Sequence, residues 1–359
     1  MTTVLKQISS YLLDKYHIGM ISKPPIYDNA YVFLLMRGDS YLPGVLAAVY
    51  SVHRTNPSAD LVVMVTPDIS EKTIDMLLTV ATHIFRVNYL SFNTVMPRSQ
   101  KQTSHYSSWI DVSYTKWISL TLPYRRIIFF DADIIVLQNV DTLFNLRAPA
   151  GCFNCAYVKP LGPIPDFLRG PRGHDGYLLH DMPVTPMVVN QLLNNNGMVC
   201  CASTILLEPN LLHYYEFCRT MEQLTINKPF GMRCASGADE QAICYFYSNI
   251  LHMTFTNIHH RYNHMSRKDG YFAPNDYARI MHYNSINKPW KLSYNAWPDV
   301  ICWYKMIASY LHDAKIKPAA IGVNASDVNK AKKATDIYTI SFMKDINKSI
   351  TSCMQLLRT

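Results

Sequence analysis

The sequence lacks several features that would by themselves place it in a class of proteins. No stretch approaches the roughly 18 uninterrupted apolar residues that a membrane-spanning helix needs. The N-terminus has no continuous apolar segment followed by small residues, so we expect no secretory signal peptide. No block of like charges and no nucleic-acid-binding motif is present. Integral membrane association and nucleic-acid binding are therefore disfavoured.

The cysteine pattern excludes two further classes. The nine cysteines are scattered and odd in number, which does not suit a disulfide framework. Cys152 and Cys155 form a CxxC pair, but no second CxxC completes a zinc site. Reduced thiols and the missing signal peptide favour a reducing compartment, so we expect a cytoplasmic protein.

What the sequence does contain is enough apolar material for a large core. Of its 359 residues 49% are hydrophobic and only 17% are charged, which excludes bulk disorder. The net charge of +8 suits an anionic ligand such as a nucleotide diphosphate, although it is also an ordinary setting for solubility.

Apolar runs of strand length alternate with helical patterns in the first half of the chain. Strands are expected at 31–36, 60–65, 83–87 and 126–130, with helices at 41–52, 71–82 and 117–122. This alternation predicts an α/β fold with a parallel sheet covered on both faces. Further on, 199–207 is expected to be a strand, and helices are expected over 209–224, 240–250 and 300–312.

The same patterns suggest how the chain is divided. Residues 1–25 are expected to form an N-terminal helical segment, and 26–295 the main domain. Within that domain, the proline- and glycine-rich stretch 150–196 is interpreted as a long loop or lid. Residues 296–359 are expected to form a helical C-terminal extension.

The sharpest local signal is a pair of acids at the end of an apolar strand. Asp131 and Asp133 directly follow 126–130, where ligands bind in open α/β sheets. Two carboxylates there are costly unless a cation or hydrogen bonds compensate them. Mg²⁺ and Mn²⁺ prefer such oxygen ligands and bind between carboxylates and a diphosphate. The alternative is a turn or helix-capping role for the acids, and we favour metal binding.

Three motifs in order resemble the glycogenin-like glycosyltransferases, the retaining family eight. The first lies within 31–66 and includes Asp39-Ser40-Tyr41 and Gly44. The second runs from Thr115-Lys116-Trp117 through Asp131-Ala132-Asp133 to Phe144, and the third is His282 followed by Lys288-Pro289-Trp290. Together they cover about residues 28 to 295. The resemblance implies a GT-A fold, a Rossmann-like nucleotide-sugar-binding architecture with a mixed, mainly parallel central sheet.

The resemblance also implies roles for individual residues. Asp131, Asp133 and His282 match the three protein ligands of the family's Mn²⁺, and two carboxylates with an imidazole suit Mn²⁺ better than Mg²⁺. The match also implies contacts with the nucleotide-sugar donor, by residues that line its uridine, sugar and diphosphate: Leu35, Asp39, Tyr41, Lys116, Ala132 and Lys288. Tyr41 could equally be a core aromatic residue.

The family's acidic-Gln motif, which lies beside the sugar, resembles 236–241. Aligning Gln241 places Glu240 on the family aspartate, with Asp239 a close rival. An acid that caps the start of a helix is the alternative interpretation. Cys201-Ala202-Ser203 departs from the family's Asn-Ser-Gly, which puts one sugar contact in doubt.

We therefore predict an Mn²⁺-dependent retaining hexosyltransferase that uses a UDP-sugar, with UDP-glucose first and UDP-galactose next. The acceptor is left open among glycan, protein and small molecule, and a homodimer is compatible with the resemblance. Self-glucosylation at Tyr262, Tyr271 or Tyr277 is a weak hypothesis, because no tyrosine aligns well. The alternatives are a catalytically inactive nucleotide-sugar- or glycan-binding protein and a nucleotidyltransferase, although no glycine-rich phosphate loop supports the latter.

Overall fold

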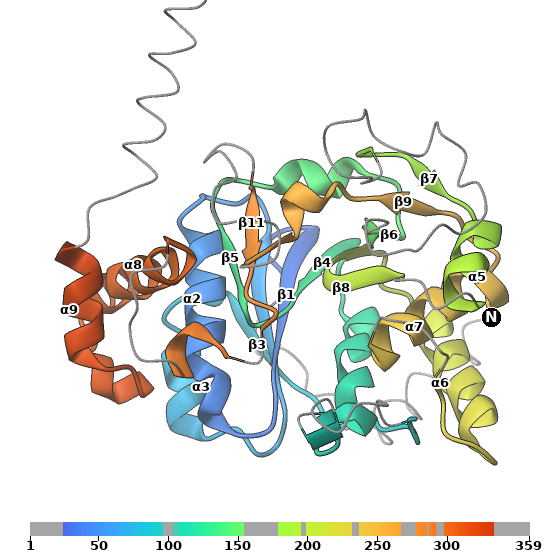
Figure 1. Ribbon diagram of the computed structural model, residues 1–359, viewed down its shortest axis with the longest axis horizontal. Coiled ribbons are helices and arrows are strands. Elements are labelled where there is room, and N and C mark those ends of the chain that lie inside the picture. The colour runs from blue at the N-terminus through green and yellow to red at the C-terminus, as the bar shows by residue number, and fades with distance from the viewer. Residues whose placement is uncertain are drawn as a thin grey trace, which may run out of the picture.

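The fold is described from a computed structural model of the chain, in which a large twisted sheet lies between layers of helices (Figure 1). The described residues are 24–95, 103–104, 106–153, 179–194, 199–231, 237–266, 278–285, 287–291 and 298–333. Residues 1–23 of the expected N-terminal segment, 154–178 and 195–196 of the expected lid, and 334–359 of the expected C-terminal extension lie outside them, as do Tyr271 and Tyr277.

The large sheet has eight strands in the order β3-β2-β1-β4-β8-β6-β9-β7. Strands β3, β2, β1 and β4 are parallel, β8 is antiparallel to both β4 and β6, β9 is parallel to β6, and β7 is antiparallel to β9. Their bounds are β1 Asn29–Leu35, β2 Asp60–Val65, β3 His83–Arg86, β4 Arg126–Phe130, β6 Ala150–Phe153, β7 Pro183–Val184, β8 Cys200–Leu207 and β9 Phe255–Asn257. The predicted mixed, mainly parallel α/β architecture is confirmed.

A second sheet of three short strands meets the large one where β4 ends. It contains β5 (Ile134–Val136), β10 (His264–Met265) and β11 (Ile280–His282), with β11 antiparallel to β5 and parallel to β10. Because β5 follows β4 after three residues, this sheet brings His282, which pairs with Ile134, to the D-A-D loop.

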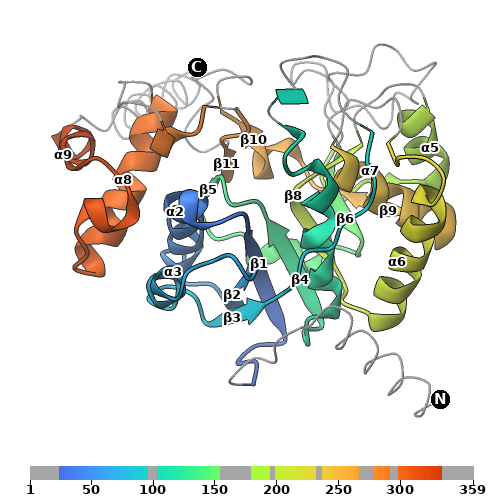
Figure 2. The ribbon, with the colours of Figure 1, turned by 90° about the horizontal axis from the view of Figure 1, so that it is seen from below.

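Two hydrophobic clusters lie on opposite faces of the large sheet. In β1, Tyr31 and Phe33 enter one cluster and Val32 enters the other, because successive strand residues point to opposite faces. Figure 2 shows α2, α3 and α8 on one side of the sheet and α5, α6 and α7 on the other. The α-helices are α2 Leu42–His53, α3 Glu71–Leu77, α5 Pro186–Asn194, α6 Leu211–Thr225, α7 Ala238–Tyr245, α8 Pro298–Asp313 and α9 Ala325–Lys333.

Tighter and wider helical turns join these elements. The longest 3-10 segment is η2 (Ile110–Thr121), and a π-helical turn, η6 (Phe246–Ile250), extends α7. The other short 3-10 turns among the described residues are η1 Asp39–Tyr41, η3 Asp141–Asn145, η7 His260–Tyr262, η8 Pro289–Lys291 and η9 Pro318–Ile321. None of the described helices is both long and apolar enough to span a membrane.

Several predicted elements differ in extent from the observed ones. The helix expected over 71–82 ends at Leu77, and the helix expected over 117–122 is part of the longer η2. The expected loop 150–196 contains β6 and β7 and the helix α5. The many prolines of this stretch suggested a loop, but 186–194 carry an apolar stripe typical of a helix. Val189, Leu192 and Leu193 are buried along this face of α5.

Candidate active site

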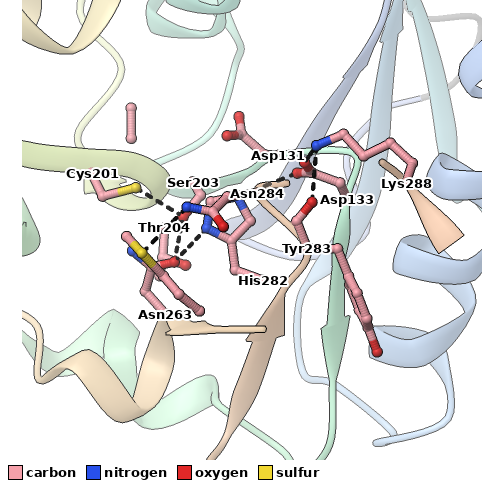
Figure 3. Close-up of polar contacts among 12 residues, drawn as sticks. Asp131, Asp133, Cys201, Ser203, Thr204, Asn263, His282, Tyr283, Asn284 and Lys288 are labelled. Carbon is pink, nitrogen blue, oxygen red and sulfur yellow. Dashed lines mark hydrogen bonds and ion pairs between the residues drawn. The ribbon is translucent and has the colours of Figure 1, made fainter. Parts of the chain in front are cut away.

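The D-A-D loop occupies the three residues between β4 and β5. Its main chain is held at both ends, because the Asp131 N–H donates to the Ser203 carbonyl at 3.2 Å and the Asp133 carbonyl accepts from the Tyr283 N–H at 2.8 Å. Ser203 belongs to β8, and Tyr283 directly follows β11. The two sheets therefore fix the backbone from which both carboxylates project (Figure 3).

Three potential metal ligands converge here. One ligand atom each from Asp131, Asp133 and His282 lies within 4.8 Å of the others. Nε2 of His282 is 3.5 Å from Oδ1 of Asp133. The Asp133 and His282 side chains are 11% and 6% exposed, and that of Asp131 is 30% exposed, so a ligand would approach past Asp131. Two oxygens and one imidazole nitrogen are a donor set that suits a divalent cation.

The ring of His282 is oriented by a chain of hydrogen bonds. Oδ1 of Asn263 lies 2.8 Å from Nδ1 of His282 and also accepts from the Ser203 hydroxyl at 2.8 Å. Because this oxygen can only accept, Nδ1 of His282 carries the hydrogen, and Nε2 is the nitrogen that faces Asp133 and would bind a metal. The Cys201 thiol continues the chain at 3.4 Å from the Ser203 hydroxyl.

Positive groups surround Asp133. The Lys288 ammonium is 2.5 Å from Oδ2 of Asp133 and donates to the Tyr283 carbonyl at 2.9 Å. Burial alone would raise the pKa of the Asp133 carboxyl, but Lys288 and His282 outweigh it and hold that pKa well below its usual range. Burial would likewise lower the pKa of His282, whereas Asp133 raises it to about 10. Asp133 is therefore ionised and already compensated at neutral pH.

Lys116 joins the D-A-D loop to the start of α7. Its ammonium lies 3.2 Å from Oδ1 of Asp131 and 2.7 Å from Oδ2 of Asp239. Burial would lower the pKa of Lys116, but the two carboxylates together raise it well above its ordinary value. Trp117, the next residue, donates its indole N–H to the Asp239 carbonyl at 3.2 Å. One lysine thus neutralises an acid from each of the two predicted motifs.

The two neighbouring acids of α7 have different surroundings. Both oxygens of Glu240 accept backbone N–H groups, from Gly237 at 2.8 Å and from Ala202 at 3.0 Å. This is the helix-start role that the sequence left open as an alternative. Asp239 instead points to Lys116. Burial and the charge of Asp239 raise the pKa of Glu240 to about 7.

The other expected donor contacts lie at the ends of β1 and α2. Leu35 is fully buried in the hydrophobic core, so only its main chain could meet a ligand. Asp39 is exposed and accepts from the Ser70 hydroxyl at 2.7 Å. Tyr41 is half-buried, with its ring edge-on to Trp290 at 5.3 Å, and the Lys291 ammonium lies 4.8 Å from the ring centre. Gln241 is buried within α7.

The arrangement contains functional candidates that carry no signal in the sequence. Asn263 lies 19 residues before His282 in a histidine- and tyrosine-rich stretch without a family motif. Its role depends on the parallel pairing of β10 with β11, which brings the segments together. Tyr262, the described candidate for self-glucosylation, lies in η7 directly before Asn263 and stacks on His180 at 5.3 Å.

Comparison with known proteins identifies the family of the segment that carries this loop. Residues 32–168 match the family described as Glycosyl transferase family 8. The resemblance drawn from the motifs is thereby confirmed for this segment, which contains both aspartates of the D-A-D loop.

Individual relatives agree with this assignment. The chain is 34% identical over 138 residues to the Uncharacterized protein R707 of Acanthamoeba polyphaga mimivirus, covering 37% of this chain and 47% of that protein. It is 30% identical over 132 residues to UDP-glucuronate:xylan alpha-glucuronosyltransferase 1 of Arabidopsis thaliana, covering 36% and 19%. Human Glycogenin-1 is 32% identical over 126 residues, covering 33% of each chain.

The matched region spans less than half the length of each of these relatives. Among solved structures, the glycosyltransferase GlyE of Streptococcus pneumoniae TIGR4 aligns with a TM-score of 0.48 and 12% identity, covering 82% of this chain and 64% of that one.

Proposed function

We propose that the protein is an Mn²⁺-dependent retaining glycosyltransferase that transfers a hexose from a UDP-sugar. The convergence of Asp131, Asp133 and His282 within 4.8 Å carries this proposal. Asp131 and Asp133 lie inside the segment that matches family 8. The charges support it, since Asp131 and Asp133 are each paired with a lysine while Asp131 stays partly exposed to an incoming ligand.

Each of these residues has a task in the proposed reaction. Asp131, Asp133 and His282 would hold the metal, with the His282 ring oriented through Nδ1 by Asn263 and the proton on Nε2 released on metal binding. A bound Mn²⁺ supplies positive charge that neutralises the donor diphosphate. Lys288 adds a second positive charge beside the same site and would stabilise the leaving UDP. Ala132, between the two aspartates, would offer only its backbone.

Asp239 is the acid that we assign to the sugar. Its carboxylate contacts the Lys116 ammonium, which also contacts Asp131. The Lys116 side chain thus links Asp239 to the proposed metal site. An ionised carboxylate at this position can accept hydrogen bonds from sugar hydroxyl groups. Glu240, whose oxygens both accept backbone N–H groups, would support the helix instead. Gln241 is proposed to assist from the same turn.

UDP-glucose is the donor we favour, with UDP-galactose next. UDP-glucuronate is included among the donors to be tested, because one relative is named for its use. We propose the cytoplasm as the location, on the support of the six described cysteines, which are all free thiols. Retention of configuration would require either front-face transfer or two successive displacements.

The first test measures UDP release from a panel of UDP-sugars, in Mn²⁺ or in EDTA. We expect release with Mn²⁺ from a hexose donor, none in EDTA, and none from Asp133→Ala. Asp75→Ala, an exposed acid of α3, is the matched control and should behave as the natural protein.

Two other results of this test would reject the proposal. Tight UDP binding through Mn²⁺ without release, across the panel and with candidate acceptors, would make the chain a nucleotide-sugar-binding protein. Release of inorganic pyrophosphate would point to a nucleotidyltransferase.

A further inference from the structure

Gly44 lies where three functional segments of the molecule touch. It is buried in the first turn of α2, three residues after Tyr41. A Cβ atom at this position would lie 2.5 Å from Cη2 and 2.8 Å from Cζ2 of Trp290. It would also lie 2.8 Å from the carbonyl oxygen of Ala132. Side chains do not come this close to other heavy atoms, so any residue larger than glycine must displace at least one of these neighbours.

The two neighbours belong to the two loops of the metal site. Ala132 is the middle residue of the D-A-D loop, between Asp131 and Asp133. Trp290 lies two residues after Lys288, the lysine that contacts Asp133. The two segments that carry Asp133 and Lys288 therefore both contact α2 at Gly44.

Each neighbour is held by contacts of its own. The Trp290 indole packs against Trp303 of α8, with ring centres 5.6 Å apart. The D-A-D backbone is held by its hydrogen bonds to Ser203 and Tyr283. Strain from a methyl group at residue 44 would consequently pass into the spacing of the metal ligands and Lys288.

The backbone conformation of Gly44 does not by itself call for glycine. Its φ angle is not among the positive values found for glycines in the described residues. Within a helix, glycine is less favourable than alanine by about 1 kcal/mol. Close approach, rather than chain flexibility, is what this position requires.

We propose that Gly44 is a positioning residue that sets the geometry of the metal site by letting α2 contact the Ala132 carbonyl and Trp290 directly. This inference rests on the proposed function only for its link to Mn²⁺. The contact itself acts on the D-A-D loop whether or not a metal is bound.

The test compares Gly44→Ala with Val49→Ala. Val49 is a fully buried residue of the same helix, and its truncation lowers stability without adding an atom. The first readout is hydrogen–deuterium exchange of the segment 127–137 in metal-free protein. The second is Mn²⁺ affinity, measured by titration of the free-ion electron paramagnetic resonance signal.

We expect faster exchange of 127–137 and an Mn²⁺ affinity about 10- to 100-fold lower in Gly44→Ala, the range found when a supporting contact of a metal site is removed. Val49→Ala should leave both readouts near those of the natural protein. Unchanged exchange in Gly44→Ala, or equal changes in both variants, would overturn the proposal. If the natural protein binds no Mn²⁺, the proposed function fails, while the exchange readout still decides the role of Gly44.

A second pair of variants covers the case in which Gly44→Ala does not fold. Trp290→Phe lacks the two indole atoms nearest to the added methyl group, so Gly44→Ala in that background keeps the close contact with the Ala132 carbonyl without those two. We expect this double variant to fold and to show faster exchange of 127–137 than Trp290→Phe alone. Equal exchange in the two would reject the role of Gly44.

Discussion

Two pairs of acids in this molecule look alike in sequence and behave differently in the fold. Asp131 and Asp133 follow a strand, and with His282 their ligand atoms converge within 4.8 Å. Asp239 and Glu240 open a helix and diverge, one toward Lys116 and the other toward the backbone N–H groups of Gly237 and Ala202. The negative charges of Asp131 and Asp133 are compensated by cationic side chains. In the second pair, the Glu240 carboxylate is instead hydrogen-bonded by backbone N–H groups.

The reason for the difference lies in the backbone groups that each element leaves without partners. The first turn of a helix exposes N–H groups that no helical carbonyl accepts, so a buried acid there is readily taken up as a cap. A strand end inside a sheet has its N–H groups paired, and its acids must find cations. An acidic motif at a strand end is therefore the better indicator of a metal site.

The largest expected effect separates the two aspartates of the first pair. Asp131→Asn and Asp133→Asn should each lower kcat/KM for UDP release by about 1,000-fold or more, because each removes a metal ligand. Only Asp133→Asn should also cost about 3 kcal/mol of stability, because it leaves Lys288 and His282 buried without their counter-charge. Steady-state kinetics and urea denaturation measure the two quantities. Equal stability losses would contradict the different burial of the two carboxylates.

The next effect distinguishes the two acids of α7. Asp239→Asn should lower kcat by about 100-fold, since it removes the charge that faces Lys116 and the proposed sugar position. Glu240→Gln should lower kcat by less than about 10-fold and act mainly on stability, because one backbone N–H loses its acceptor. Kinetics of both variants with the same donor decide between them. The reverse order would return the sugar-facing role to Glu240, as the alignment on Gln241 suggested.

This pair also marks how far the sequence could predict the site. The D-A-D loop, His282 and Lys288 were expected from motifs, and the fold brings them together because β4, β5 and β11 adjoin. The alignment could not separate Asp239 from Glu240, because their directions depend on where α7 begins relative to Ala202 of β8. Nor could it indicate Asn263 or the contact at Gly44, since both arise only from tertiary packing.

A third prediction concerns the contact between Asn263 and His282, which orients a proposed metal ligand. Asn263→Ala removes the oxygen that accepts from Nδ1 of His282, so the ring can rotate or change tautomer. Mn²⁺ affinity should fall by about 10- to 100-fold, with a smaller loss of kcat at saturating metal. Asn263→Asp keeps an acceptor in place and should retain most of the affinity. A similar loss in both variants would show that Asn263 acts through packing and not by orienting the imidazole.

The last prediction is the contribution of Glu240 to the pH dependence of stability. Its pKa is raised from 4.5 to about 7 in the folded protein. Between these values the folded state therefore binds a proton that the unfolded state has released. Stability contributed by this group consequently falls as pH rises from about 4.5 to 7, by at most about 3 kcal/mol.

Glu240→Gln cannot ionise, so its free energy of unfolding should decline less across this interval than that of the natural protein. Urea denaturation at several pH values between 4.5 and 7.5 gives the two slopes, and their difference removes the contributions of groups that do not interact with Glu240. Glu208→Gln, at an exposed acid paired with Arg126, should leave the slope unchanged. If Glu240→Gln keeps the slope of the natural protein, Glu240 is ionised throughout this range. Its two backbone N–H partners would then outweigh its burial and the charge of Asp239.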